Sequence, residues 1–106
     1  MSIIHNKDIK SPKLQAVIVE PILIGCIKKI TLPEILFDIQ RILPLSDTVI
    51  KKYLFYLIDY ELISYDGQKQ MYILEEGGFS LLDMIEREKR QEITNINDIT
   101  ITFECT

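Results

Sequence analysis

The chain has 106 residues, a net charge of −4, and hydrophobic residues at 47% of its positions. This length suits one domain, and this composition is typical of a globular chain with a core rather than a disordered one. The acidic balance argues mildly against a nucleic-acid partner, because neutralisation of phosphates by Lys and Arg supplies most of the nonspecific affinity of a protein for nucleic acid. The distribution of charge along the chain matters more than its sum. We expect one domain over residues 1–106, with a core at about 13–91, an N-terminal arm at 1–10 and a C-terminal strand or tail at 93–106.

The two cysteines and the single histidine predict no metal site. Cys26 and Cys105 lie far apart without a CxxC motif, so we expect free thiols, and a disulfide between them stays open. His5 is the only histidine, which argues against zinc. The N-terminus lacks the pattern of a signal peptide, and Glu20 helps to interrupt the most apolar stretch, 14–30. We therefore expect a cytoplasmic protein without a membrane partner.

The first element after the arm is a predicted helix at about 13–27. Ser11 can serve as its N-cap, with Pro12 in the first turn, where proline is tolerated. Pro21 lies awkwardly in this helix, because proline removes a backbone donor and kinks or splits helices. The β-branched run 17–19 keeps a strand before Pro21 open as an alternative.

Two further helices are predicted, each with its own start signal. Thr31 and Glu34 have the spacing of a capping box, and Pro44 ends the helix that this box begins. Ser46 caps the next helix, and Asp47 suits its positive N-terminal end. Apolar residues recur at helical spacing in both segments. They are Ile35, Leu36, Ile39, Ile42 and Leu43 in the first, and Ile50, Tyr53, Leu54, Leu57 and Ile58 in the second.

A hairpin, a fourth helix and a strand are predicted in the remainder. The β-rich runs 62–65 and 70–74 flank Asp66-Gly67, a turn signal of hairpins. The helix is expected at about 79–91, after a turn at Gly77-Gly78. Its expected inward-facing residues are Phe79, Leu82 and Ile85, with Leu81 and Met84 as further candidates. A last strand with one buried face follows from the period-2 alternation of Ile99, Ile101 and Phe103 with polar residues.

The order of three helices, a hairpin, a fourth helix and a strand predicts an α+β fold of the winged helix-turn-helix type, and the short turn Pro44-Leu45 suits it. Motifs at about 13–85 add to this interpretation. They are Pro44-Leu45-Ser46-Asp47, Lys51-Lys52-Tyr53-Leu54, Glu61-Leu62-Ile63 and Tyr72-Ile73-Leu74-Glu75-Glu76-Gly77-Gly78. In these motifs the chain resembles the small winged-helix DNA-binding regulators of archaea, with a recognition helix, two wing strands and a last helix.

The resemblance implies a transcription regulator that binds double-stranded DNA. In such proteins the third helix enters the major groove, and the wing touches the backbone or the minor groove. The candidate DNA contacts are Ser46, Thr48, Lys51, Lys52 and Phe55 on the third helix, Gln68, Lys69 and Gln70 on the wing, and Lys28 and Lys29 after the first helix.

Plainer interpretations stand beside these contacts. The lysines also suit solvated helix faces, the glutamines suit a polar turn, and Phe55 is expected to pack under the wing rather than on a base. The third helix and wing hold no arginine and more acidic than basic residues. An adaptor that binds a protein instead of DNA is therefore the alternative function, since a fold does not determine a function.

A homodimer is expected through the fourth helix or through the last strand as an exposed edge. The candidate residues are Phe79, Leu82, Ile85, Ile99, Ile101 and Phe103. Pairing of Ile3-Ile4 in the arm with the last strand is the intramolecular alternative. No catalytic residues or cofactors are expected, because the chain shows neither a nucleophile elbow nor a phosphate-binding glycine loop.

Overall fold

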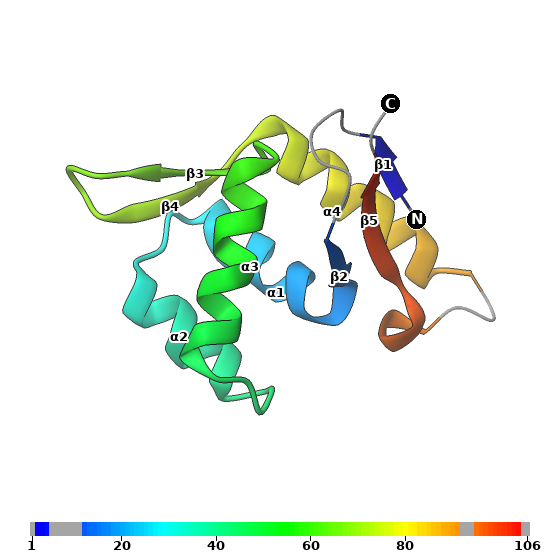
Figure 1. Ribbon diagram of the computed structural model, residues 1–106, viewed down its shortest axis with the longest axis horizontal. Coiled ribbons are helices and arrows are strands. Elements are labelled where there is room, and N and C mark those ends of the chain that lie inside the picture. Colours follow the sequence, from blue (N-terminus) through cyan, green and yellow to red (C-terminus); the bar gives the residue numbers. More distant parts are fainter. Residues whose placement is uncertain (1, 5–11, 92–94, 105–106) are drawn as a thin grey trace.

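The computed structural model describes residues 2–4, 12–91 and 95–104 (Figure 1). In this part of the chain, helices and strands together form an α+β fold, as expected. The elements in chain order are β1 (Ser2–Ile4), β2 (Lys13–Gln15), α1 (Ala16–Ile27), α2 (Leu32–Gln40), α3 (Asp47–Asp59), β3 (Ile63–Asp66), β4 (Met71–Leu74), α4 (Glu76–Lys89), the 3-10 helix η1 (Ile96–Asp98) and β5 (Thr100–Glu104).

The strands form two small sheets at opposite ends of the molecule (Figure 1). One is the antiparallel hairpin β3–β4, which projects from the body. Ile30 forms an antiparallel bridge with Tyr72 of β4. The Ile30 N–H donates to the Tyr72 carbonyl at 3.1 Å, and the Tyr72 N–H donates to the Ile30 carbonyl at 2.7 Å. The other sheet has the order β1-β5-β2, in which β5 runs parallel to β1 and antiparallel to β2.

The prediction of an exposed last strand is wrong. β5 is the central strand of its sheet, because β1 and β2 pair with its two edges. The intramolecular alternative is the one that the structure confirms, since Ile3 pairs with Phe103. Ile99, Ile101 and Phe103 are buried within the chain. Their apolar faces are therefore part of the core and not of a free edge.

The first helix begins later than predicted, at Ala16. The residues before it form β2, and the Gln15 N–H donates to the Tyr53 hydroxyl at 3.1 Å instead of joining a helical turn. Ser11, the expected N-cap, lies outside the described residues. The alternative of a strand at 17–19 is also wrong, because these residues belong to α1, which continues through Pro21.

The starts of the next two helices are confirmed. The predicted end of α2 at Pro44 is wrong, because this helix ends at Gln40 and leaves Ile42 exposed beyond it. Thr31 and Glu34 form the capping box, with Glu34 Oε1 accepting from the Thr31 N–H at 3.1 Å and Thr31 Oγ1 accepting from the Glu34 N–H at 3.4 Å. Hydrogen bonding to the Thr31 side chain lowers the pKa of Glu34. Ser46 Oγ accepts from the Val49 N–H at 3.2 Å. These bonds satisfy backbone donors that the first turn leaves without partners.

The fourth helix begins at Glu76, earlier than predicted, and includes both glycines of the expected turn. Gly78 is buried where α4 crosses the hairpin, and a Cβ there would lie 2.3 Å from both the Leu62 carbonyl oxygen and Leu74 Cδ1. The glycine thus permits a close approach of backbones. Because the helix starts here, Leu81 and Ile85 face inward, whereas Phe79 is 52% exposed, which corrects its expected inward position.

Buried residues of the helices, the hairpin and β5 form one hydrophobic cluster. The rings of Tyr60 and Phe103 stack at 3.9 Å between centroids and join the end of α3 to the three-stranded sheet. Cys26 is a free thiol in this core, and desolvation raises its pKa to about 12. Cys105 and His5 lie outside the described residues. None of the described helices combines the length and the apolar character needed to cross a bilayer.

Replacing Gly78 with Ala is expected to lower the free energy of unfolding by about 1–3 kcal/mol. The added methyl group would collide with backbone and with Leu74, and this cost exceeds the gain in helix propensity, roughly 1 kcal/mol. Urea unfolding measures the change. Gly67→Ala is the matched control, because a Cβ at Gly67 meets nothing within 4 Å and its φ is not positive. Equal stability of the two variants would contradict the close approach.

Candidate nucleic-acid interface

The helix α3 is held by one face and exposes the other. Its buried residues are Ile50, Tyr53, Leu54 and Leu57. On the opposite side, Thr48, Lys51, Lys52 and Phe55 are exposed. Phe55 is 64% exposed and contacts Tyr56 edge to face, with 5.7 Å between ring centroids. The expectation that Phe55 packs under the hairpin is therefore wrong, and its ring is available to a partner.

Side-chain hydrogen bonds hold the N-terminal end of α3. Ser46 is exposed, but its hydroxyl oxygen accepts the Val49 N–H in the cap. Gln40 of α2 donates from Nε2 to the Leu45 carbonyl at 3.2 Å and to the Asp47 carboxylate. These bonds fix the direction in which α3 leaves the turn, and they engage an acidic group that lies near the candidate contacts.

The hairpin ends in an exposed loop that carries one positive charge. Asp66 Oδ1 accepts from the Gln68 N–H at 3.0 Å and from the Lys69 N–H at 3.3 Å. Gln70, with φ of 55°, takes the left-handed conformation, whereas Gly67 does not. The chain reverses where the sequence predicts it, but through a longer loop than an Asp-Gly turn. The side chains of Gln68, Lys69 and Gln70 are exposed at the projecting end.

Lys28 and Lys29, the remaining candidate contacts, are exposed at the end of α1. They line a groove of about 400 Å³ between α1 and α2. Glu34 and Asp38 line the same groove from α2, so these two lysines form part of a mixed-charge surface. Carboxylates of the same groove thus lie on its other side from these two lysines.

A cleft that the sequence interpretation missed lies where the end of α3, the strand β3 and the start of α4 meet. Its volume is about 550 Å³, and Glu61, Glu75 and Glu76 line it together with the exposed side chains of Ile58 and Tyr65. These residues come from segments that are separated in the chain, so no local pattern brings them together. The only sequence signal was the surplus of acidic residues.

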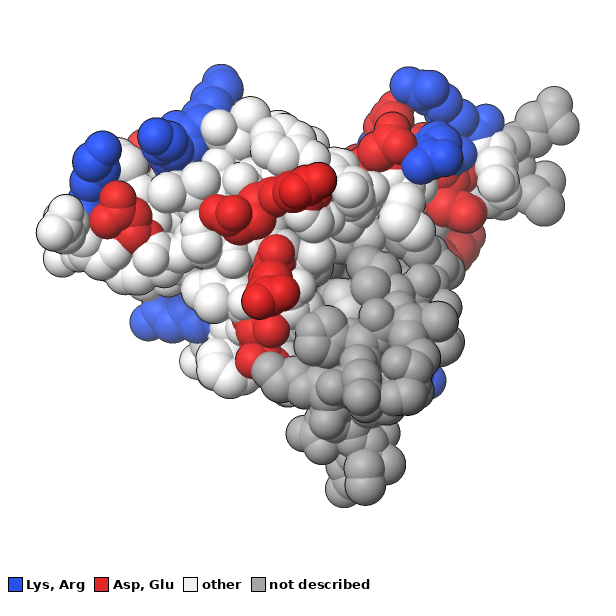
Figure 2. Space-filling model, turned by 90° about the horizontal axis from the view of Figure 1, so that it is seen from above, with Lys and Arg blue, Asp and Glu red and all other residues white. Residues whose placement is uncertain are grey.

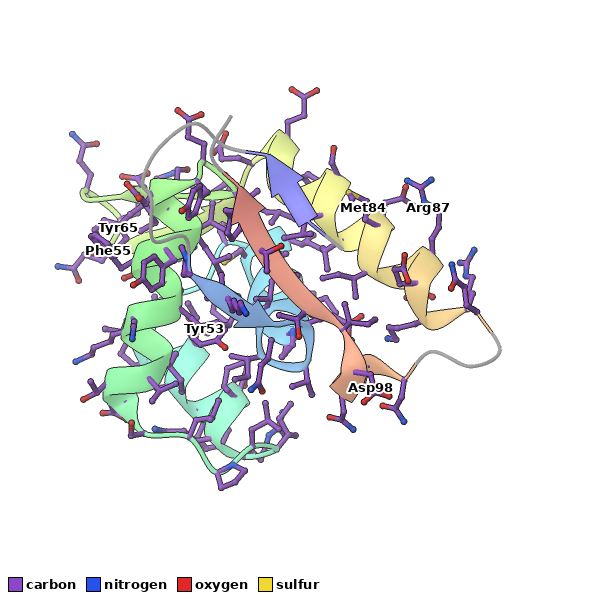
Figure 3. All side chains as sticks on the ribbon, turned by 45° about the vertical axis from the view of Figure 1, so that its right-hand side comes forward. Tyr53, Phe55, Tyr65, Met84, Arg87 and Asp98 are labelled. Carbon is purple, nitrogen blue, oxygen red and sulfur yellow. The ribbon has the colours of Figure 1, made fainter. Side chains whose placement is uncertain are left out.

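The cleft makes one side of the molecule acidic. Figure 2 shows a band of acidic side chains across the middle of the face seen from above, between basic groups near the hairpin end and the mixed charges of α4. Ser64 Oγ donates to Glu75 Oε2 at 2.6 Å, which orients one of the carboxylates. Figure 3 shows Tyr65 of β3 and Phe55 of α3 on the same side of the molecule. The exposed face of α3 therefore changes from basic to apolar and acidic along its length.

The expected dimer contacts are divided between surface and core. Phe79 is exposed and Leu82 is half-buried on α4, so both are available to a partner. Ile85 and the three apolar residues of the last strand are buried within the chain. Within the described ranges, no group of three or more His, Cys, Asp or Glu side chains could hold a metal ion.

Comparison with protein-family models, with curated proteins and with solved structures finds no match to this chain. The interpretation of its surfaces therefore depends on their geometry and charge.

Ser46→Ala is expected to lower the free energy of unfolding by about 0.5–2 kcal/mol, because the Val49 N–H loses its capping oxygen. Urea unfolding followed by circular dichroism measures the loss. Thr48→Ala, an exposed position in the same first turn, is the control and should change stability by no more than about 0.5 kcal/mol. If both variants are equally stable, the cap does not hold the start of α3.

Proposed function

We propose that the chain is a winged-helix domain that binds double-stranded DNA as a transcription regulator, with α3 in the major groove and the hairpin beside it. The observation that carries this proposal is the exposed N-terminal part of α3, where Thr48, Lys51 and Lys52 lie opposite the buried stripe. The bridge from Ile30 to Tyr72 supports it, because it anchors the projecting hairpin to the helical body. Helices of this kind insert their N-terminal residues among base edges.

Each exposed group on α3 has a defined chemical role in this proposal. Lys51 and Lys52 neutralise phosphates, and the Thr48 hydroxyl bonds to a base edge or a phosphate. Phe55 offers an apolar contact to a thymine methyl group. At the hairpin end, Lys69 adds one phosphate contact, and its glutamine neighbours add polar ones. The domain acts by binding alone, without catalysis or a cofactor.

Charge limits how DNA can approach. The carboxylates of Glu61, Glu75 and Glu76 repel phosphates, so contact is confined to the start of α3 and the tip of the hairpin. With so few positive charges, nonspecific binding by one chain is weak, with Kd of about 10⁻⁴ M or weaker. Two linked chains would gain affinity by engaging two half-sites together.

A protein adaptor is the second candidate function, and the acidic cleft favours it. Ile58 and Tyr65 offer apolar contact area there, and the surrounding carboxylates suit a basic partner better than a phosphate backbone. In this case α3 would serve as part of a scaffold, and DNA would not bind even at low salt.

The double variant Lys51→Ala/Lys52→Ala tests the DNA proposal. Each lost phosphate contact should reduce the slope of log affinity against log salt by about 0.9, so the double variant should lose nearly two units. Fluorescence anisotropy with mixed double-stranded DNA at several salt concentrations measures the slope.

Arg90→Ala is the control, because Arg90 is an exposed cation at the end of α4, outside the proposed face. Its slope should equal that of the unmodified chain. If the double variant keeps the full slope, the two lysines are not part of the interface. If the unmodified chain does not bind DNA even at low salt, the adaptor function is favoured.

A further inference from the structure

The helix α1 is apolar on every side, although it is not buried on every side. Among its twelve residues, Glu20 is the only one that carries a charge. A helix of this composition is normally enclosed by other elements. In this chain Ile24 is 50% exposed, and Ile27, one turn further along, is 48% exposed. The described part of the chain thus leaves an apolar strip of its central helix uncovered.

The strip continues onto α2 and the turn that follows it. Ile42 is 62% exposed and lines the groove between α1 and α2 together with Ile24. Phe37 is also exposed, and the Arg41 guanidinium lies 5.7 Å from the centre of its ring. Ile24 and Ile42 are thus the two large exposed apolar side chains that line the groove. Exposed apolar side chains that lie close together are typical of an interaction surface.

The two sides of this groove carry opposite net charge. Lys28 and Lys29 lie on the α1 side, whereas Glu34, Asp38 and Arg41 lie on the α2 side, where two carboxylates outnumber one guanidinium. Arg41 lies 3.9 Å from Asp38, so Glu34 is the carboxylate without an opposite charge beside it in the groove lining. A two-fold axis that runs along the groove places the basic side of one copy against the acidic side of the other. The acidic cleft beside β3 has no such property, because a second copy would bring like charges together.

We propose that a second copy of this chain docks on the α1–α2 groove and forms a two-fold homodimer, with Ile24 and Ile42 as the apolar anchors. This surface replaces the last strand, whose apolar face and edges are already used within the chain. It assigns Lys28 and Lys29 to the dimer rather than to DNA. The inference holds whether or not the domain binds DNA.

Sedimentation velocity without DNA tests the dimer over a concentration range of about 1 μM to 1 mM. The unmodified chain should change from monomer to dimer as its concentration rises. Ile24→Asp and Ile42→Asp should each raise the dimer Kd by roughly 30-fold or more, as loss of a buried anchor does. Phe79→Asp is the matched control: it adds the same charge at an exposed apolar residue of α4 and should leave the Kd unchanged.

Charge reversal gives an independent test that unfolding cannot imitate. Lys28→Glu/Lys29→Glu makes the surroundings of the groove acidic, and Asp38→Lys makes them more basic. Each variant alone should associate more weakly than the unmodified chain, because like charges meet across the axis. An equimolar mixture of the two should recover dimers that contain one copy of each.

Three results would overturn the proposal. The first is an unmodified chain that stays monomeric over the whole concentration range. The second is a Phe79→Asp variant that dissociates while Ile24→Asp and Ile42→Asp do not, which would assign the dimer to α4. The third is a mixture of charge variants that stays monomeric although both keep the circular dichroism spectrum of the unmodified chain. Because no DNA is present, none of these results depends on the proposed DNA binding.

Discussion

The helix α1 is the element that contacts the largest number of other elements in the described part of the chain. The helices α2 and α4, the strand β4 and the short helix η1 all contact it. Its apolar residues occupy nearly every position around its axis, so burial of α1 requires neighbours on several sides. The hairpin is bridged to the segment that follows α1, and α4 crosses the hairpin at Gly78. The strand β3 of the same hairpin contacts α3, which links the position of α3 to this packing.

The same central helix explains why the surface has distinct regions. Where α2 and α4 cover α1, the chain is closed, and where they do not, an apolar strip with mixed charges remains. On the other side, α3 exposes lysines near its start and ends beside three carboxylates. The basic, acidic and apolar regions of the surface therefore lie on different elements, and each of the proposed partners would use a different one of them.

Charged and apolar regions of the surface act on a partner over different distances. Exposed charges interact over a range of about 8–10 Å at physiological salt, so each charged region of the surface acts mainly on groups that approach it closely. Exposed apolar residues act only on direct contact. The proposed DNA contact and the proposed dimer contact therefore depend on different interactions, the first on exposed charge and the second on direct apolar packing.

Features that depend on neighbouring residues were determined by the sequence itself. The capping bonds of Thr31 and Ser46 and the reversal of the chain near Asp66 follow from local hydrogen bonding and turn signals. The apolar stripe of α3 follows from periodicity, except for Ile58, which was expected in the stripe but is 37% exposed. Features that depend on distant residues were decided only by the tertiary structure. The strand β5 became central because β1 and β2 pair with its two edges, and Phe79 lies on the exposed side of α4 because this helix begins at Glu76 and packs through Gly78, Leu81 and Ile85. The acidic cleft and the α1–α2 groove likewise gather side chains from separate elements. Long-range pairing and packing bring such groups together, and neither leaves a periodic signal along the chain.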